Sequence, residues 1–457
     1  MHTLEQLRSG ALAGTRRLDL SCGLTEVPDE VFALADTLEV LNLSGNRLRD
    51  LPHQLSQLHK LQVLFASDND FTALPEVLGD CPALHMVGFK ANRIAQVHAA
   101  ALPPALRWLT LTDNAIGQLP SELGQRPALQ KLMLAGNQLT ALPDSLQAAQ
   151  KLELLRVSAN RLERVPGWLV ELPRLAWLAL AGNAMGWTLP GVPDLPTVPW
   201  AALTPGELLG EGASGHIYQV LTTGWPQPLA LKLFKGAVTS DGLPEDELAA
   251  CLAAGQHPSL TTPVARLTDH PTQARGLLMP LIPAAHINLA GPPSLQSCSR
   301  DVYPPGFQLT SALALGIAHD VAHALAHLHQ RGVMHGDLYA HNILMDPVHG
   351  QARLGDFGAA TRLPRDQKEL QQSLLSLEVR ALGCLLEELA LAAQPPSPAT
   401  AITPWHHEAG TSSTADDSSA DAAVQTLQSL ARACLSDQPR HRPTAVEVAQ
   451  ALQTLKP

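Results

Sequence analysis

The 457-residue sequence predicts an α/β protein in two parts, a solenoid of short repeats over residues 1–195 and a second domain over residues 207–457. Two observations lead to this division. A leucine-rich unit returns at a nearly constant interval through the first part, whereas the second part holds glycine-rich and acidic motifs that occur once. A constant interval of this length is typical of a solenoid, in which each unit packs on its neighbours. The Pro-rich segment at 196–206 is the expected linker.

Seven asparagines mark the interval in the first part, each in a frame like LEVLNLSGNRLRDLP, and a degenerate unit, LDLSCGLTEVP, precedes them at 18–28. One such unit cannot bury its apolar face alone, so the units must fold as a stack. They resemble the leucine-rich repeat. The resemblance implies about eight repeats, with the leucines in one shared core and each asparagine amide bonded to backbone at the turn after a strand. The asparagines are Asn46, Asn69, Asn92, Asn114, Asn137, Asn160 and Asn183, 23 residues apart except for one interval of 22.

Alternation along the short strands predicts which side chains point away from the core. In LEVLNLSGN, Leu41 and Leu43 point inward, so Val40 and its equivalents in later repeats point to the concave face. These equivalents are mostly apolar. Exposed apolar surface with Trp and Arg usually marks an interaction site, so we expect this face to bind a protein substrate or regulator. The alternative is that these side chains pack against their neighbours or against the second domain. The expected binding residues are Phe65, Trp108, Met133, Arg156 and Trp177.

Three oxygen-bearing side chains lie close in sequence in the second part, within HGDLYAHNIL and GDFG. Asp337 is followed five residues later by Asn342, and Asp356 opens the second motif. Such side chains can hold magnesium and a nucleophile around a transferred phosphoryl group, which is mainly positioning and charge neutralisation. The motifs resemble the catalytic core of a protein kinase. The resemblance implies a bilobal α+β domain in which Asp337 is the catalytic base and Asn342 and Asp356 hold Mg²⁺.

The nucleotide-binding motifs of the same family precede these in the expected order. GEGASGHIYQV resembles the kinase glycine-rich loop, whose glycines let backbone N–H groups approach phosphates. Lys232 in LALK matches the lysine that holds the α- and β-phosphates, and Glu247 is its expected ion-pair partner, in preference to Glu245. The resemblance implies ATP as the cofactor, with GLLMPLIP as the hinge that contacts adenine. The expected ATP-binding residues are Gly210, Glu211, Gly212, Ala213, Ser214, Gly215, Ile217, Ala230, Lys232, Met279, Leu281 and Ile282.

The second domain departs from the kinase pattern at four places. Gly336 replaces the arginine of His-Arg-Asp, and Tyr339 replaces the lysine two residues after the aspartate. Glu378, in LSLEVRALG, replaces the usual aspartate of its helix. It lies only 22 residues after Asp356, with no Ala-Pro-Glu between them.

The residues that the resemblance places at phosphate, metal and nucleophile are nevertheless all present. We therefore expect an enzyme that transfers the γ-phosphate of ATP to a protein hydroxyl, of serine or threonine on family prevalence. One alternative is a pseudokinase scaffold that binds a partner through the repeats. The other is a small-molecule phosphotransferase, because HGDLYAHN also resembles the HGDLxxxN segment of the aminoglycoside and choline kinases.

Composition limits the classes of partner and the cellular compartment that we expect for this protein. A formal net charge of −11 argues against nucleic acid or an anionic membrane as the main partner. The N-terminal sequence lacks the apolar run of a secretory signal, and the six cysteines form no CxxC pair, so we expect reduced thiols in a cytoplasmic protein. Residues 391–423, rich in Pro, Ser, Thr, Ala and Asp, are the expected low-complexity loop. The sequence carries no signal for the oligomeric state.

Overall fold

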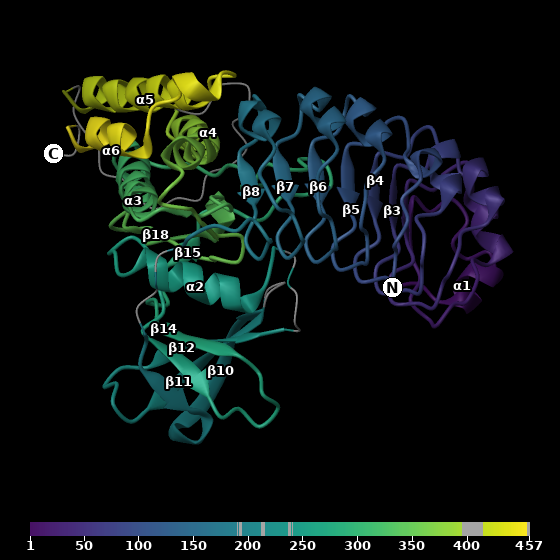
Figure 1. The fold of residues 1–457 in the computed structure, drawn as a ribbon, viewed down its shortest axis with the longest axis horizontal. Coiled ribbons are helices and arrows are strands. Elements are labelled where there is room, and N and C mark those ends of the chain that lie inside the picture. The colour runs from purple at the N-terminus through teal and green to yellow at the C-terminus, as the bar shows by residue number, and fades with distance from the viewer. Residues whose placement is uncertain are drawn as a thin grey trace. The chain divides into compact units, whose positions relative to one another are not determined.

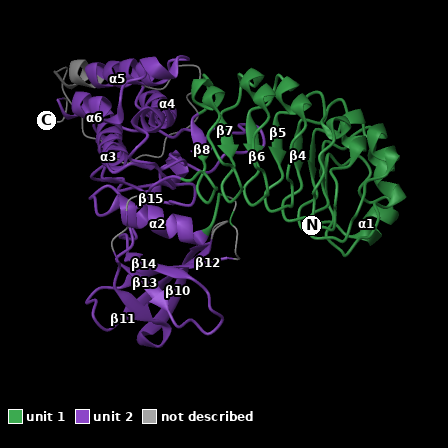
Figure 2. Cartoon of the chain, viewed as in Figure 1, with its two compact units in different colours: residues 1–175, 179–186, 238–243 green, residues 176–178, 187–237, 244–457 purple. Residues whose placement is uncertain are grey.

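The computed structural model describes residues 1–454, except 190, 192–193, 212–214, 236–238, 240 and 395–414. The chain forms two compact units, which are coloured separately in Figure 2. The first comprises residues 1–175, 179–186 and 238–243, and the second comprises residues 176–178, 187–237 and 244–457. Two short segments, 176–178 and 238–243, therefore belong to the unit that does not contain their neighbours in sequence.

The repeat region forms one parallel sheet with its strands in chain order from β1 to β8 (Figure 1). Leu41 and Leu43 are both 0% exposed, so the predicted inward direction of these leucines is confirmed and the leucines form the shared core. The equivalents of Val40 at Val63, Met86 and Leu154 are buried as well, so the expectation of exposed apolar side chains is wrong at these three repeats. The strands are β1 (Arg17–Asp19), β2 (Val40–Asn42), β3 (Val63–Phe65), β4 (Met86–Gly88), β5 (Trp108–Thr110), β6 (Lys131–Met133), β7 (Leu154–Arg156) and β8 (Trp177–Ala179). The helices are α1 (Leu4–Arg8) and the 3₁₀ helices η1 (Asp29–Leu34), η2 (His53–Gln57), η3 (Glu76–Asp80), η4 (Ala99–Ala101), η5 (Ser121–Gln125), η6 (Asp144–Ala148) and η7 (Gly167–Glu171).

The seven asparagines satisfy backbone groups at the turns, as the repeat resemblance implies. Asn137 is representative: its side-chain oxygen accepts from Ile116 N at 3.0 Å, and its amide nitrogen donates to the carbonyls of Leu111 and Leu134, each at 2.9 Å. The other six make the same kinds of contact, to the preceding repeat and to their own. Because buried backbone polar groups must find partners, the regular interval of the asparagines follows directly from the stacking.

Two of the five side chains expected to bind a partner are buried. Arg156 and Trp177 are each 2% exposed. Arg156 Nε donates to Asp241 Oδ1 at 2.8 Å, and both residues belong to the first unit. Trp177 stacks on Tyr339, and both of these residues belong to the second unit. The expectation that these two side chains face a partner is wrong, because segments of the chain itself cover them. The other three, Phe65, Trp108 and Met133, are half-buried.

A six-stranded sheet with helix α2 (Pro244–Ala254) forms one part of the second unit. Its strand order is β10-β11-β12-β14-β13-β9, antiparallel throughout except between β13 and β9. Apolar side chains such as Val220, Leu231 and Leu278 fill its core. The segment expected as a linker includes β9, η8 and the start of β10. The elements are β9 (Thr197–Pro199), η8 (Trp200–Ala202), β10 (Leu203–Glu211), β11 (Gly215–Thr222), β12 (Leu229–Phe234), β13 (Ala265–Thr268) and β14 (Gly276–Pro280).

Helices dominate the rest of the second unit. The central helix α3 (Ser311–Gln330) begins where Thr310 accepts a hydrogen bond from Leu313 N, and Gly332 follows its end at a φ of +71°. The other helices are α4 (Lys368–Ala392), α5 (Ala415–Cys434), α6 (Ala445–Gln453), η9 (Ala340–Asn342) and η10 (Pro439–His441). Two small sheets accompany them, β15 (Ile287–Asn288) with β17 (Ile343–Met345) and β18 (Ala352–Leu354), and β16 (Val333–Met334) with β19 (Thr361–Arg362).

The expected low-complexity loop falls mostly outside the described residues, at 395–414, while its flanks belong to α4 and α5. None of the helices in the described ranges is long and apolar enough to cross a membrane. The predicted α/β fold class, a leucine-rich-repeat solenoid followed by an α+β kinase-like domain, is confirmed.

Candidate active site

A buried ion pair joins the sheet of the second unit to helix α2. Lys232 on β12 approaches Glu247 on α2, with Nζ and Oε1 2.6 Å apart. The competing acid, Glu245, instead pairs with Arg275 at the surface. Burial acts to lower the pKa of the Lys232 ammonium, but the charges of Asp356 and Glu247 outweigh it, so its pKa is raised above the ordinary lysine value. The lysine is therefore fixed in place and fully charged.

Asp356 extends this pair toward the acidic motifs. Its Oδ1 lies 3.7 Å from Lys232 Nζ and accepts a hydrogen bond from Gly358 N at 3.1 Å. Desolvation acts to raise the pKa of Asp356, but the Lys232 charge and the Gly358 N–H lower it to a net value below the ordinary one. The side chain is 46% exposed, so an ionised carboxylate remains accessible to a ligand.

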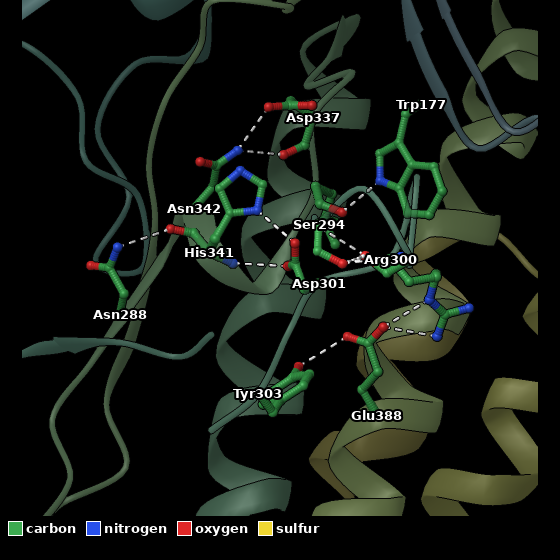
Figure 3. Close-up of polar contacts among 12 residues, drawn as sticks. Trp177, Asn288, Ser294, Arg300, Asp301, Tyr303, Asp337, His341, Asn342 and Glu388 are labelled. Atoms are coloured by element: carbon green, nitrogen blue, oxygen red, sulfur yellow. Dashed lines mark hydrogen bonds and ion pairs between the residues drawn. The ribbon is translucent and has the colours of Figure 1, made fainter. Parts of the chain in front are cut away.

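Asp337 and Asn342 form the second half of the site (Figure 3). The amide nitrogen of Asn342 donates to Asp337 Oδ2 and to the Asp337 carbonyl, each at 2.9 Å. A carbonyl oxygen and an ionised carboxylate oxygen can only accept hydrogen bonds, so the end of the Asn342 amide that faces Asp337 must be its nitrogen. The amide oxygen of Asn342 therefore points away from Asp337. In the antiparallel pair β17–β18, Ile343 lies opposite Leu354. Asn342 directly precedes β17, and Asp356 follows β18 by two residues. The two predicted metal ligands therefore lie at the same end of this hairpin.

Glu378, on helix α4, holds the backbone of the loop that carries Asp337. Its carboxylate is 1% exposed and accepts hydrogen bonds from His335 N at 3.0 Å and from Gly336 N. His329 Nε2 lies 2.9 Å from the same carboxylate. Its position in LSLEVRALG is the sequence signal for this role, although it was not among the expected site residues.

Asp301 is a supporting residue that the sequence did not reveal. Its side chain is 1% exposed and accepts from His341 N at 3.0 Å, while its other oxygen lies 2.7 Å from His341 Nδ1 (Figure 3). His341 directly precedes Asn342. Arg300 and Tyr303, on either side of Asp301, both bond to Glu388 on α4, which secures the segment. Asp301 and His341 are 40 residues apart, and no motif surrounds Asp301.

The expected ATP-binding residues fall into three groups. Gly210, Glu211, Gly215 and Ile217 lie on β10 and β11, while Gly212, Ala213 and Ser214 lie outside the described residues. A Cβ on Gly215 would stand 2.3 Å from the Leu233 carbonyl, so only glycine fits this close approach. Ala230 pairs with Met279 across β12 and β14, and Leu281 and Ile282 follow β14. Ile282 lines a cavity of about 320 Å³ with Thr262 and Arg353, and Lys232 does not line it.

Comparisons with known proteins find relatives of both parts of the chain. The relatives match only in part, and this chain spans at most 24% of the length of those named here. The DNA damage-responsive serine/threonine-protein kinase RqkA of Deinococcus radiodurans is 30% identical over 177 residues, 37% of this chain and 24% of the relative. Mitogen-activated protein kinase kinase kinase YODA of Arabidopsis thaliana is 29% identical over 141 residues, 27% of this chain and 16% of the relative. Leucine-rich repeat-containing protein 7 of Rattus norvegicus is 46% identical over 59 residues, 13% of this chain and 4% of the relative.

Family models cover both parts of the chain. The leucine-rich repeat matches residues 13–71 and 127–185. The protein kinase domain matches residues 203–453, more than half of the chain, and spans every active-site residue described above. The chain therefore belongs to the protein kinase domain family, with leucine-rich repeats preceding that domain.

Proposed function

We propose that this chain is an active protein kinase, which transfers the γ-phosphate of ATP to a serine or threonine hydroxyl of a protein in the presence of Mg²⁺. The observation that carries the proposal is the joint presence of two preformed pairs. Lys232 is locked to Glu247 with Asp356 at 3.7 Å, and Asp337 is locked to Asn342 at 2.9 Å. A scaffold that only bound partners would not need five such side chains in one arrangement.

The residues present fit a bound Mg²⁺, because hard oxygen ligands are what this ion prefers. Asn342 offers its amide oxygen, since its amide nitrogen is bonded to Asp337, and Asp356 offers an accessible carboxylate. When bound, the ion would supply charge neutralisation at the phosphates.

The chain's own groups would divide the remaining work. Lys232 would hold the α- and β-phosphates while Glu247 keeps its ammonium in place. Asp337 would accept the proton of the attacking hydroxyl. The glycine-rich loop and the hinge would enclose the nucleotide. Serine or threonine as the acceptor agrees with the name of the RqkA relative, a serine/threonine-protein kinase. The six cysteines, all of which lie in the described part of the chain, form no disulfides, which supports a reducing compartment such as the cytoplasm.

Incubation of the full chain with γ-labelled ATP and Mg²⁺ tests this proposal and its alternatives. Generic proteins, host lysate and hydroxyl-bearing metabolites are offered in parallel, and phosphosites are mapped by mass spectrometry. Label on protein serine or threonine supports the proposal. Label on metabolites alone would instead indicate a small-molecule phosphotransferase. Binding of Mg-ATP without any transfer would indicate a pseudokinase.

We also infer that the repeats recruit the protein substrate or a regulator near Trp108, which remains half-buried between aromatic and basic neighbours. Phe65 lies edge-on with its ring centroid 6.3 Å away, and Lys131 Nζ lies 4.1 Å from the indole. Trp108→Ser is expected to lower labelling of the recruited substrate about tenfold or more, as for a central interface tryptophan, and to leave autophosphorylation unchanged. Trp168→Ser is the matched control, because that indole bonds to Asp144 on the 3₁₀-helix side. Equal labelling by both variants would show that Trp108 is structural.

A further inference from the structure

Gly336 cannot carry a side chain, and one of the reasons lies in a segment far away in sequence. Its φ is +75°, which favours glycine. A Cβ at this position would stand 2.5 Å from the Leu178 carbonyl oxygen and 2.6 Å from the Ala359 carbonyl oxygen. Leu178 belongs to residues 176–178, which form part of the second unit. The backbone of this segment therefore occupies the space that an arginine at 336 would need.

Tyr339, the other departure beside Asp337, contacts the same segment. Its ring stacks on Trp177 with centroids 4.4 Å apart and an interplanar angle of 6°. The Trp177 indole N–H also donates to the Leu338 carbonyl at 2.9 Å. Both Trp177 and Tyr339 are buried. Residues 177–178 thus contact the chain on both sides of the proposed catalytic base, at Gly336 before it and at Leu338 and Tyr339 after it.

From this arrangement we propose that Trp177 is a positioning residue, which holds the loop around Asp337 in the geometry for proton acceptance. The inference rests on the proposed kinase activity. It connects both unusual residues to one segment, since Gly336 leaves room for the Leu178 carbonyl as well as for that of Ala359, and Tyr339 supplies the surface on which Trp177 stacks. The loop around Asp337 is then held by direct contacts with residues 177–178. A tryptophan suits the role because it offers a wide ring and one hydrogen-bond donor.

The contacts divide into two that can be removed separately. Trp177→Phe keeps an aromatic ring for the stack on Tyr339 and removes the donor to Leu338. Trp177→Ala removes both. Trp168→Ala is the matched control, because it removes a tryptophan from the preceding repeat segment whose indole bonds only to the exposed Asp144 side chain in the described contacts.

Hydrogen exchange of the full chain gives a readout that does not need activity. Amides in residues 336–342 are expected to exchange about tenfold faster or more in Trp177→Ala, because local opening is no longer opposed. Trp177→Phe is expected to lie between that variant and the wild type. The Trp168→Ala control should match the wild type. Unchanged exchange of residues 336–342 in Trp177→Ala would overturn the proposal.

Steady-state kinetics supply the second readout. Trp177→Ala is expected to lower kcat by about 10- to 100-fold, since a small misplacement of a reacting group is costly, with the KM for ATP and the affinity for Mg-ATP unchanged. Tyr339→Ala should lower kcat less than Trp177→Ala does, because it removes the stack and leaves the donor to Leu338, and the double variant should show no more loss than Trp177→Ala alone. Partial recovery in Trp177→Phe separates positioning from general loss of structure. A kcat that rises in Trp177→Ala, or a loss of ATP affinity equal to the loss of kcat, would overturn the proposal.

Failure of the underlying function is distinguishable from failure of this inference. If the wild type transfers no phosphoryl group to any acceptor, the proposed kinase activity is wrong. The exchange measurement then still decides whether Trp177 holds the loop, because it compares the same amides in variants with and without the stack.

Discussion

Asp337→Ala and Asp356→Ala are each expected to lower the rate of phosphoryl transfer by about 10²- to 10³-fold or more, because each removes a preorganised charged group from the reacting centre. Asp337 would accept the substrate proton, and Asp356 would hold the metal. Neither substitution leaves a buried charge alone. Lys232 keeps Glu247 at 2.6 Å, and the Asn342 amide nitrogen keeps the backbone carbonyl at position 337 as an acceptor. The fold should therefore remain intact.

Initial rates with γ-labelled ATP, calorimetric binding of Mg-ATP and thermal unfolding distinguish the two roles. Asp356→Ala should weaken Mg-ATP binding as well as transfer. Asp337→Ala should bind Mg-ATP as the wild type does, because its side chain would act on the substrate hydroxyl. Glu245→Ala is the matched control, since this acid lies on the same helix as Glu247 but pairs with Arg275 at the surface. Transfer within about tenfold of the wild type in either aspartate variant would contradict its assignment.

Local patterns in the sequence were sufficient to predict the contacts of residues that belong to short motifs. The constant interval of the asparagines predicted their hydrogen bonds to the backbone, because every repeat must satisfy the same backbone groups at its turn. Asn137 does so with Ile116 and Leu111. The kinase motifs led to Lys232 with Glu247, which the structure brings to 2.6 Å. In both cases neighbouring secondary-structure elements of fixed geometry determine the contact.

Contacts between remote segments could not be predicted in the same way. Alternation along a strand states which face Trp177 points to, but it does not state what covers that face. Trp177 and Leu338 are 161 residues apart, and Arg156 and Asp241 are 85 apart. Asp301 likewise reaches His341 from a segment without a motif. The departures at 336 and 339 were visible in the sequence as anomalies, and only the tertiary contacts give them a physical cause.

Glu378→Ala is expected to lower the free energy of unfolding of the second unit by about 2–5 kcal/mol, because it leaves buried backbone donors and a buried histidine without their acceptor. The wild-type carboxylate accepts from His335 N and Gly336 N and lies 2.9 Å from His329 Nε2. Glu387→Ala on the same helix is the control. That side chain is 48% exposed and pairs with Arg300, so the expected loss is about 0–1 kcal/mol. Denaturant unfolding followed by circular dichroism measures both, and equal midpoints for the two variants would refute the role of Glu378.

The pH dependence of this loss follows from the charge of the carboxylate. Burial acts to raise the pKa of Glu378, but the hydrogen bond and charge of His329, the charge of His335 and the Gly336 N–H lower it, so the pKa in the folded state is below the usual value of 4.5. A carboxyl group whose pKa is depressed by folding stabilises the protein above its unfolded pKa, and this contribution is lost as the pH falls through the folded pKa. Glu378→Gln, which cannot ionise, should therefore differ most from the wild type near neutral pH, and the difference should shrink as the solution is acidified below the usual carboxyl pKa. A difference that is constant from neutral to acidic pH would show that the contacts of Glu378 do not depend on its charge, and that shape and hydrogen bonding alone hold the loop to helix α4.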